Sequence, residues 1–123
     1  MSGYATVTRV DKPWGYEIIW ANTPLYVGKI LHITAGQALS LQYHHQKDET
    51  IHLLRGRMIY RVQRGDTLDE VSLEAGQSFR NEPGTIHQME AVTDCDVLEA
   101  STPHLDDVVR LQDRYGREGT SAP

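Results

Sequence analysis

The sequence predicts an all-β fold, a single antiparallel sandwich or barrel of the jelly-roll type. Short runs of alternating apolar and polar residues suggest about eight or more strands. Turn signals recur about every 8–12 residues, and no long amphipathic helix precedes residue 105. A chain of 123 residues is long enough to bury one hydrophobic core but not two, so we expect one domain over residues 1–123.

The first half of the chain alternates in this way from its start. Residues 1–11 predict an arm or an edge strand, and Lys12-Pro13-Trp14-Gly15 predicts a turn. In the strand expected at residues 25–33, Val27, Lys29, Leu31 and Ile33 share one face because side chains alternate along a strand. The strands expected in this half cover residues 16–20, 25–33, 39–44 and 50–54.

The second half continues the pattern and ends differently. Tight turns are expected at Arg64-Gly65-Asp66 and at Glu82-Pro83-Gly84. Residues 106–117 predict one to two turns of helix, which Asp106 or Asp107 would cap and Gly116 would end. The strands expected here cover residues 57–63, 70–73, 86–92 and 97–101; the domain core is then about 12–117, with a flexible tail at 118–123.

Composition narrows the range of partners. The net charge is −5 and no run of lysine and arginine stands out, so nucleic acid and anionic membranes are not expected partners. Cys95 is the single cysteine, which excludes an internal disulfide and fits a reducing compartment. The N-terminus lacks the apolar core of a signal peptide, and no apolar run approaches the roughly 20 residues of a membrane helix. We therefore expect a cytoplasmic protein that acts on a small molecule.

Several potential metal ligands lie close together in the sequence. Gln42 and His44 are two apart on an expected strand and point the same way, whereas His45 points the other way. Glu49 opens the returning strand and can turn back toward His44, and His87 follows the later Pro-Gly turn. Imidazole with oxygen donors suits Zn, Mn, Fe, Co or Ni. We expect one divalent transition metal per chain, held by Gln42, His44, Glu49 and His87.

The spacing of residues 36–56 resembles the first motif of the cupin family. That motif runs glycine, five residues, H-x-H, four residues, glutamate, six residues, glycine, and every spacing holds here. His44 and Glu49 match the motif, while Gln42 replaces its first histidine. The resemblance implies a double-stranded β-helix, the jelly-roll barrel of the cupins.

The second cupin motif has a weaker counterpart at residues 76–91. Gly76, Gly84 and His87 keep the motif's spacing. The proline is displaced by one residue to Pro83, and Ala91 stands where the motif has asparagine. These departures leave the ligand His87 in place.

Three stretches resemble one branch of the cupins more closely. KPWGYE (12–17), SLQYHHQKDE (40–49) and DDVVRLQDRYGR (106–117) are similar to the cupin domain of type II mannose-6-phosphate isomerases. In such enzymes a metal polarises the oxygens of an open-chain sugar while a base moves a proton between two carbons. The resemblance thus implies aldose–ketose isomerisation of a sugar phosphate.

The same resemblance suggests roles for individual residues. Lys29 and Glu49 are the candidate catalytic residues. Lys29 aligns with a lysine of the family, and we expect it to point into the barrel, where burial would lower its pKa. A phosphate needs cations near the barrel mouth. The candidates for this role are Lys12, Arg80, Arg110 and Arg117.

Three alternatives stay open at this point. The chain would instead be a cupin without isomerase activity, either a small-molecule or carbohydrate-binding module or a metal-dependent oxygenase. In the second alternative, Lys29 would pair with Glu99 or extend its ammonium to the rim of the barrel. In the third, a shift in strand register would make His45 a metal ligand in place of Gln42. We also expect a homodimer through the arm and the outer strand faces that carry Ile30, His32 and Tyr60.

Overall fold

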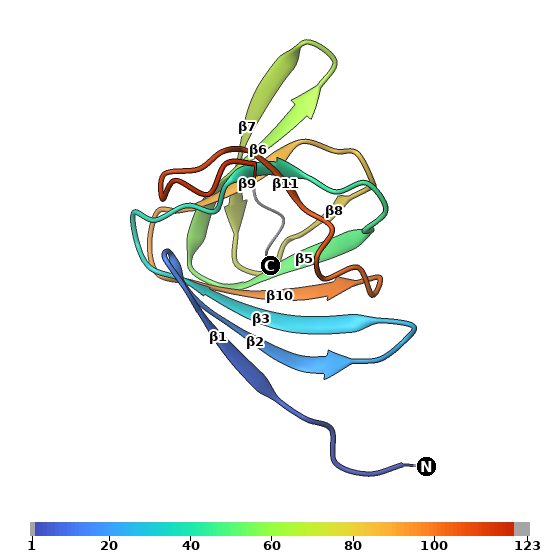
Figure 1. Cartoon of the computed structure of the whole chain (residues 1–123). Helices are drawn as coiled ribbons and strands as arrows, with labels where there is room; N and C mark the ends of the chain where they lie inside the picture. Colours follow the sequence, from blue (N-terminus) through green and yellow to red (C-terminus); the bar gives the residue numbers. More distant parts are fainter. Residues whose placement is uncertain (1, 120–123) are drawn as a thin grey trace.

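The computed structural model describes residues 2–119. Within this range the chain forms eleven β-strands and no helix. All strand pairs are antiparallel and belong to two sheets that wrap around a shared interior (Figure 1). The jelly roll predicted from the sequence is confirmed.

The larger sheet contains six strands in the order β1-β2-β3-β10-β5-β8. Their bounds are Thr8–Lys12 (β1), Gly15–Asn22 (β2), Val27–Ile33 (β3), Cys95–Ser101 (β10), Glu49–Arg55 (β5) and Ser78–Asn81 (β8). The smaller sheet has the order β11-β4-β9-β6-β7. Its strands span Val109–Gln112 (β11), Leu41–Tyr43 (β4), His87–Ala91 (β9), Arg57–Arg64 (β6) and Thr67–Glu74 (β7).

The hydrophobic core lies between the two sheets and follows from the two-residue period of the strands. On β5 the side chains of Glu49, Ile51 and Leu53 are buried, while those between them are more exposed. On β6 the buried residues are Met58, Tyr60 and Val62. The same inner faces that carry these apolar residues also carry the polar groups described below.

The C-terminal helix predicted for residues 106–117 is wrong. Val109–Gln112 forms strand β11 instead, in which Arg110 is the register partner of Gln42 on β4. Burial alternates here, since Val108 and Arg110 are buried and Val109 between them is half-buried. One or two isolated helical turns are unstable, whereas pairing with β4 provides hydrogen bonds and a buried face. This strand directs Arg110 toward the interior of the barrel.

The N-terminal segment is an edge strand over part of its length. Thr8–Lys12 pairs with β2, and the preceding residues extend away from the barrel (Figure 1). Tyr60, expected on an outer face, is fully buried with its ring centroid 4.5 Å from that of Phe79. The strand turns this tyrosine inward with its apolar neighbours, so it has no place in a dimer contact. Residues 120–123 of the expected tail lie outside the described range.

Candidate metal centre and cavity

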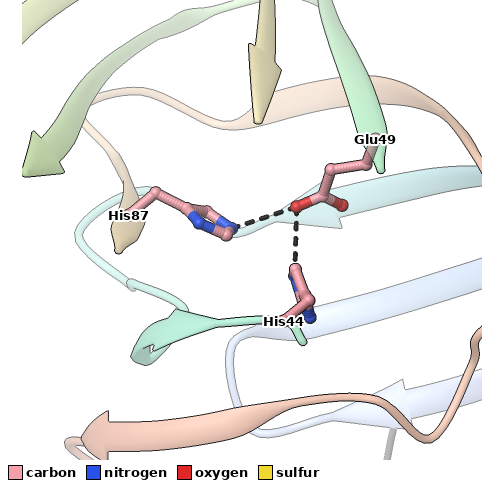
Figure 2. Close-up of side chains that lie close together, drawn as sticks. All are labelled: His44, Glu49 and His87. Carbon is pink, nitrogen blue, oxygen red and sulfur yellow. Dashed lines mark hydrogen bonds and ion pairs between the residues drawn. The ribbon is translucent and has the colours of Figure 1, made fainter. Parts of the chain in front are cut away.

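Three of the four predicted ligands meet inside the barrel. His44 follows β4, Glu49 opens β5 and His87 opens β9. One ligand atom from each lies within 4.8 Å of the other two, and all three residues are at most 4 % exposed. Figure 2 shows both imidazoles turned toward the same carboxylate oxygen of Glu49.

Backbone carbonyls fix the tautomers of the two histidines. Nδ1 of His44 donates to the carbonyl oxygen of Asp107 at 2.5 Å, and Nδ1 of His87 donates to that of Thr85 at 2.8 Å. A carbonyl oxygen only accepts, so both Nδ1 atoms carry a proton, and Nε2 is the nitrogen that each ring would offer to a metal. Such outer hydrogen bonds are typical of metal-binding histidines.

The Nε2 atoms of both histidines face one carboxylate oxygen. Nε2 of His44 lies 3.2 Å from Oε1 of Glu49, and Nε2 of His87 lies 3.0 Å from the same oxygen. Nε2 of His87 makes no hydrogen bond with any described residue. Two imidazole nitrogens and a carboxylate oxygen that converge in a buried space form a donor set that a cation can share. The residues present therefore fit a divalent metal.

Glu49 is ionised in this environment. Burial acts to raise its pKa, but Lys47 and the two histidines hold the pKa well below its usual value. Oε1 faces the imidazoles and accepts from Nδ2 of Asn81 at 3.3 Å. Oε2 lies 3.3 Å from Nζ of Lys47. Only one of its two oxygens is thus turned toward the histidines.

The two remaining ligand candidates lie differently. Gln42 is the register partner of His87 and lines the adjoining cavity, where its Oε1 accepts from the hydroxyl of Ser40 at 2.7 Å. His45 is exposed, and its ring stacks edge-on against Tyr43. The structure therefore brings Gln42 beside the cluster and leaves His45 outside it.

Lys47 is a buried component of the site that the sequence analysis missed. Its Nζ bridges Oε2 of Glu49 and, at 3.1 Å, Oε2 of Glu99. Burial acts to lower the pKa of Lys47, but the two carboxylates raise it further than burial lowers it. The position of Lys47 two residues before Glu49 is the signal that it shares the inward face.

A second charged group occupies the other end of the larger sheet. Oε2 of Glu17 on β2 accepts from Nζ of Lys29 on β3 at 3.2 Å, and Oε1 lies 3.8 Å from Nζ of Lys12. All three side chains are at most 6 % exposed. Lys29 points into the barrel, and its ion-pair partner is Glu17 rather than Glu99.

The two groups are linked by a row of charges across four adjacent strands. Lys29 on β3 is directly opposite Glu99 on β10. Glu17 on β2 is two positions away from the residue opposite Lys29, and Glu49 on β5 is two positions away from the residue opposite Glu99. Such diagonal residues share a face of the sheet. The floor of the barrel thus carries Glu17, Lys29, Glu99 and Glu49 in that order.

Both groups border one cavity of about 60 Å³. Apolar walls come from Trp14, Leu31, Leu39 and Val108. Among the described residues, five cationic side chains and two carboxylates line it: Lys12, Lys29, Lys47, Arg110, Arg117, Glu17 and Glu99. The wall therefore carries charges of both signs, since Lys29 is ion-paired with Glu17 and Lys47 with Glu99.

The electrostatics of Lys12 reflect this crowding. Burial lowers its pKa, and the nearby charges of Lys29, Arg110 and Arg117 add to that effect, while Glu17 partly offsets it. Arg117 is held by Asp113, whose carboxylate accepts from the guanidinium at 2.9 and 3.1 Å.

Arg80 does not reach the cavity. Its guanidinium makes two hydrogen bonds to Asp48, at 3.1 and 2.7 Å, and the side chain is 57 % exposed. On β8 the outward positions alternate with Phe79 and the buried Asn81, so Arg80 lies on the outer surface of the barrel.

Comparison with known proteins identifies the family. Residues 29–101 match the family described as Cupin domain. The chain belongs to the cupin family. No curated protein sequence matches it.

Solved structures with this cupin fold are distant in sequence. The capsular polysaccharide assembling protein CapF from Staphylococcus aureus has a TM-score of 0.76 at 17 % identity, over 88 % of this cupin and 32 % of CapF. KdgF from Halomonas sp. has a TM-score of 0.68 at 20 % identity, over 78 % of this cupin and 87 % of KdgF. Oxalate decarboxylase from Bacillus subtilis, described with Mn(II) centres, has a TM-score of 0.68 at 12 % identity, over 80 % of this cupin and 28 % of that enzyme.

These likenesses concern the fold. This cupin spans about a third of the length of CapF and less of the decarboxylase. Residues 2–119 contain no helix that is long and apolar enough to cross a membrane.

Proposed function

We propose that this cupin is a metal-dependent aldose–ketose isomerase of the mannose-6-phosphate type, acting on an anionic open-chain sugar. One observation carries the proposal. The three stretches that resemble type II mannose-6-phosphate isomerases, residues 12–17, 40–49 and 106–117, are far apart in the sequence. All three contribute residues to the walls of the cavity beside the candidate metal centre.

His44, Glu49 and His87 would hold the metal, with Gln42 beside them. Bound there, a divalent metal supplies Lewis acidity that polarises the carbonyl and hydroxyl oxygens of the sugar. The ionised Glu49, whose pKa is held low, and the fixed tautomers of the histidines prepare these ligands. Mn is a supported choice, since the decarboxylase neighbour is described with Mn(II), and N and O donors also suit Zn, Fe, Co or Ni.

Lys29 is our candidate for the group that moves the proton. Lys29 lines the cavity, where its Nζ is held by Glu17 at 3.2 Å, and it would act as the base in its neutral amine form. The amine takes the proton from C2 of the aldose, giving an enediolate with its charge on O1. Return of that proton to C1, with transfer of the hydroxyl proton from O2 to O1, yields the ketose.

The phosphate would be attracted by Lys12, Arg110 and Arg117. These three cations come from separate elements and border the same cavity, and arginine matches the geometry of phosphate oxygens well. Arg80, expected in this role from the sequence, lies on the outer surface and is left out of the proposal.

The experiment combines metal analysis with turnover. Wild-type protein is expected to contain about one metal per chain and to convert mannose 6-phosphate to fructose 6-phosphate. His44→Ala should lose both. His45→Ala is the matched control, because the neighbouring imidazole is exposed and should leave both unchanged. Metal without turnover in the wild type would refute the isomerase, and absence of metal would refute the centre.

The size of the cavity favours a second candidate, a cupin that binds or transforms a small carboxylate. Small-molecule pockets usually measure about 300–1,000 Å³, whereas this cavity measures about 60 Å³. Oxalate decarboxylase, a structural neighbour, is named for a two-carbon dicarboxylate. A binding module or an oxygenase with a redox metal would fit the same walls. Tight binding of oxalate by the metal-loaded protein, with no binding of sugar phosphates, would select this alternative.

A further inference from the structure

Glu17 has one carboxylate oxygen without a hydrogen bond. The residue is 4 % exposed and lines the cavity. Oε2 accepts from Lys29, but no described residue gives Oε1 a hydrogen bond. Nζ of Lys12 lies 3.8 Å from Oε1, which is too far for a hydrogen bond.

A buried acceptor in this state is costly unless a donor reaches it. The donor has to come from whatever occupies the cavity. A phosphate or carboxylate group has only acceptors at neutral pH and is repelled by this oxygen. A hydroxyl group is a neutral donor and fits between Glu17 and the cations around it.

We propose that Oε1 of Glu17 binds a hydroxyl group of the substrate, so that the cavity selects hydroxylated anions over plain ones. The inference rests on the proposed function for its substrate class, a polyol phosphate. Different residues of the cavity would then bind different groups of the substrate. The cations Lys12, Arg110 and Arg117 attract the anionic group, and Glu17 accepts a hydrogen bond from a hydroxyl. Glu17 is thereby a specificity-determining residue.

The substitution Glu17→Gln tests this with little change in shape. The amide has one acceptor oxygen, which Lys29 would engage, and its NH₂ group would then face the cavity where Oε1 stood. The acceptor for a hydroxyl would be replaced by a donor. Glu90→Gln is the matched control. Glu90 lies on β9 of the smaller sheet, where it is ion-paired with Arg61 and Arg114, and it does not line the cavity.

The measurement is calorimetric titration of the metal-loaded proteins with mannitol 1-phosphate and its monodeoxy analogues, which cannot be isomerised. In the wild type, removal of one particular hydroxyl should weaken binding about tenfold or more, as expected for a hydrogen bond to a charged group. Glu17→Gln should abolish this difference in affinity between mannitol 1-phosphate and that deoxy analogue. Glu90→Gln should retain the difference.

Two results would overturn the inference. If Glu17→Gln weakens all the ligands equally, Glu17 only supports Lys29. If every monodeoxy analogue binds the wild type as tightly as mannitol 1-phosphate does, no hydroxyl is recognised. The same conclusion follows if neither mannitol 1-phosphate nor its analogues bind. The proposed function is tested separately by turnover of mannose 6-phosphate. A protein that distinguishes the ligands as expected but does not turn over this sugar would keep the hydroxyl inference and refute the isomerase.

Discussion

Replacement of Lys47 by methionine should destabilise the metal-free protein strongly. Its ammonium lies 3.3 Å from Glu49 and 3.1 Å from Glu99, and all three side chains are at most 8 % exposed. At an effective dielectric constant of about 20, each contact has a Coulomb energy of about 5 kcal/mol. Much of this sum is offset because the ammonium no longer needs to be desolvated. The expected net loss is about 3–5 kcal/mol, the range for breaking a buried ion pair.

Urea denaturation in the presence of a chelator measures this loss as a decrease in the free energy of unfolding. Lys47→Met/Glu99→Gln should recover part of it, since the double variant removes one of the uncompensated carboxylates. Arg80→Met is the control, because its ion pair with Asp48 is exposed and should contribute only about 0.2–1 kcal/mol. A loss below about 1 kcal/mol for Lys47→Met would refute the buried bridge, as would a double variant no more stable than the single one.

Three further predictions test other parts of the molecule. Burial acts to raise the pKa of Asp96, but hydrogen bonds from His32 and Arg55 hold this pKa below 3.8. The ionised Asp96 therefore stabilises the folded protein above about pH 4. This contribution is lost as the pH falls through the pKa of the folded state. Asp96→Asn should lower the melting temperature at pH 7 but not at the acid end of a pH series. Asp107 accepts three backbone N–H groups of the loop before β5, so Asp107→Ala should weaken metal binding about tenfold in a chelator competition, and unchanged affinity would contradict this supporting role. Gly56 has a φ of 102°, and an added Cβ would clash with the carbonyl oxygen of Asp94. In urea denaturation, Gly56→Ala should therefore lower the free energy of unfolding by more than about 2 kcal/mol. Gly76→Ala, with open space around it, should lower it by only about 1–2 kcal/mol.

The strands were predictable because their signal is local. Alternation of apolar and polar residues indicated most of β3, β5 and β6. The spacing from His44 to Glu49 indicated two of the three residues that meet as a candidate metal site. The C-terminal strand β11 was missed because a short polar segment acquires its structure from pairing with β4, which no local pattern reports.

The cavity was only partly predictable for the same reason. Lys29 was expected inside from its apolar strand neighbours, but its partner Glu17 depends on the register between β2 and β3. Glu99 and Lys47 likewise meet across strands distant in sequence. A row of charges that crosses four strands is a property of the assembled sheet, so it becomes visible only when the strands are aligned.

The position of β11 bears on the order in which the molecule matures. A ribosome delivers the chain from its N-terminus, so His44, Glu49 and His87 all emerge before Asp107, whose carbonyl orients the His44 imidazole. Arg110 and Arg117 of the cavity wall emerge later still. A nascent chain thus carries the candidate metal ligands before it carries the backbone carbonyl that orients one of them. Selective loading with metal is expected to be a late event in biogenesis, after β11 has docked against β4.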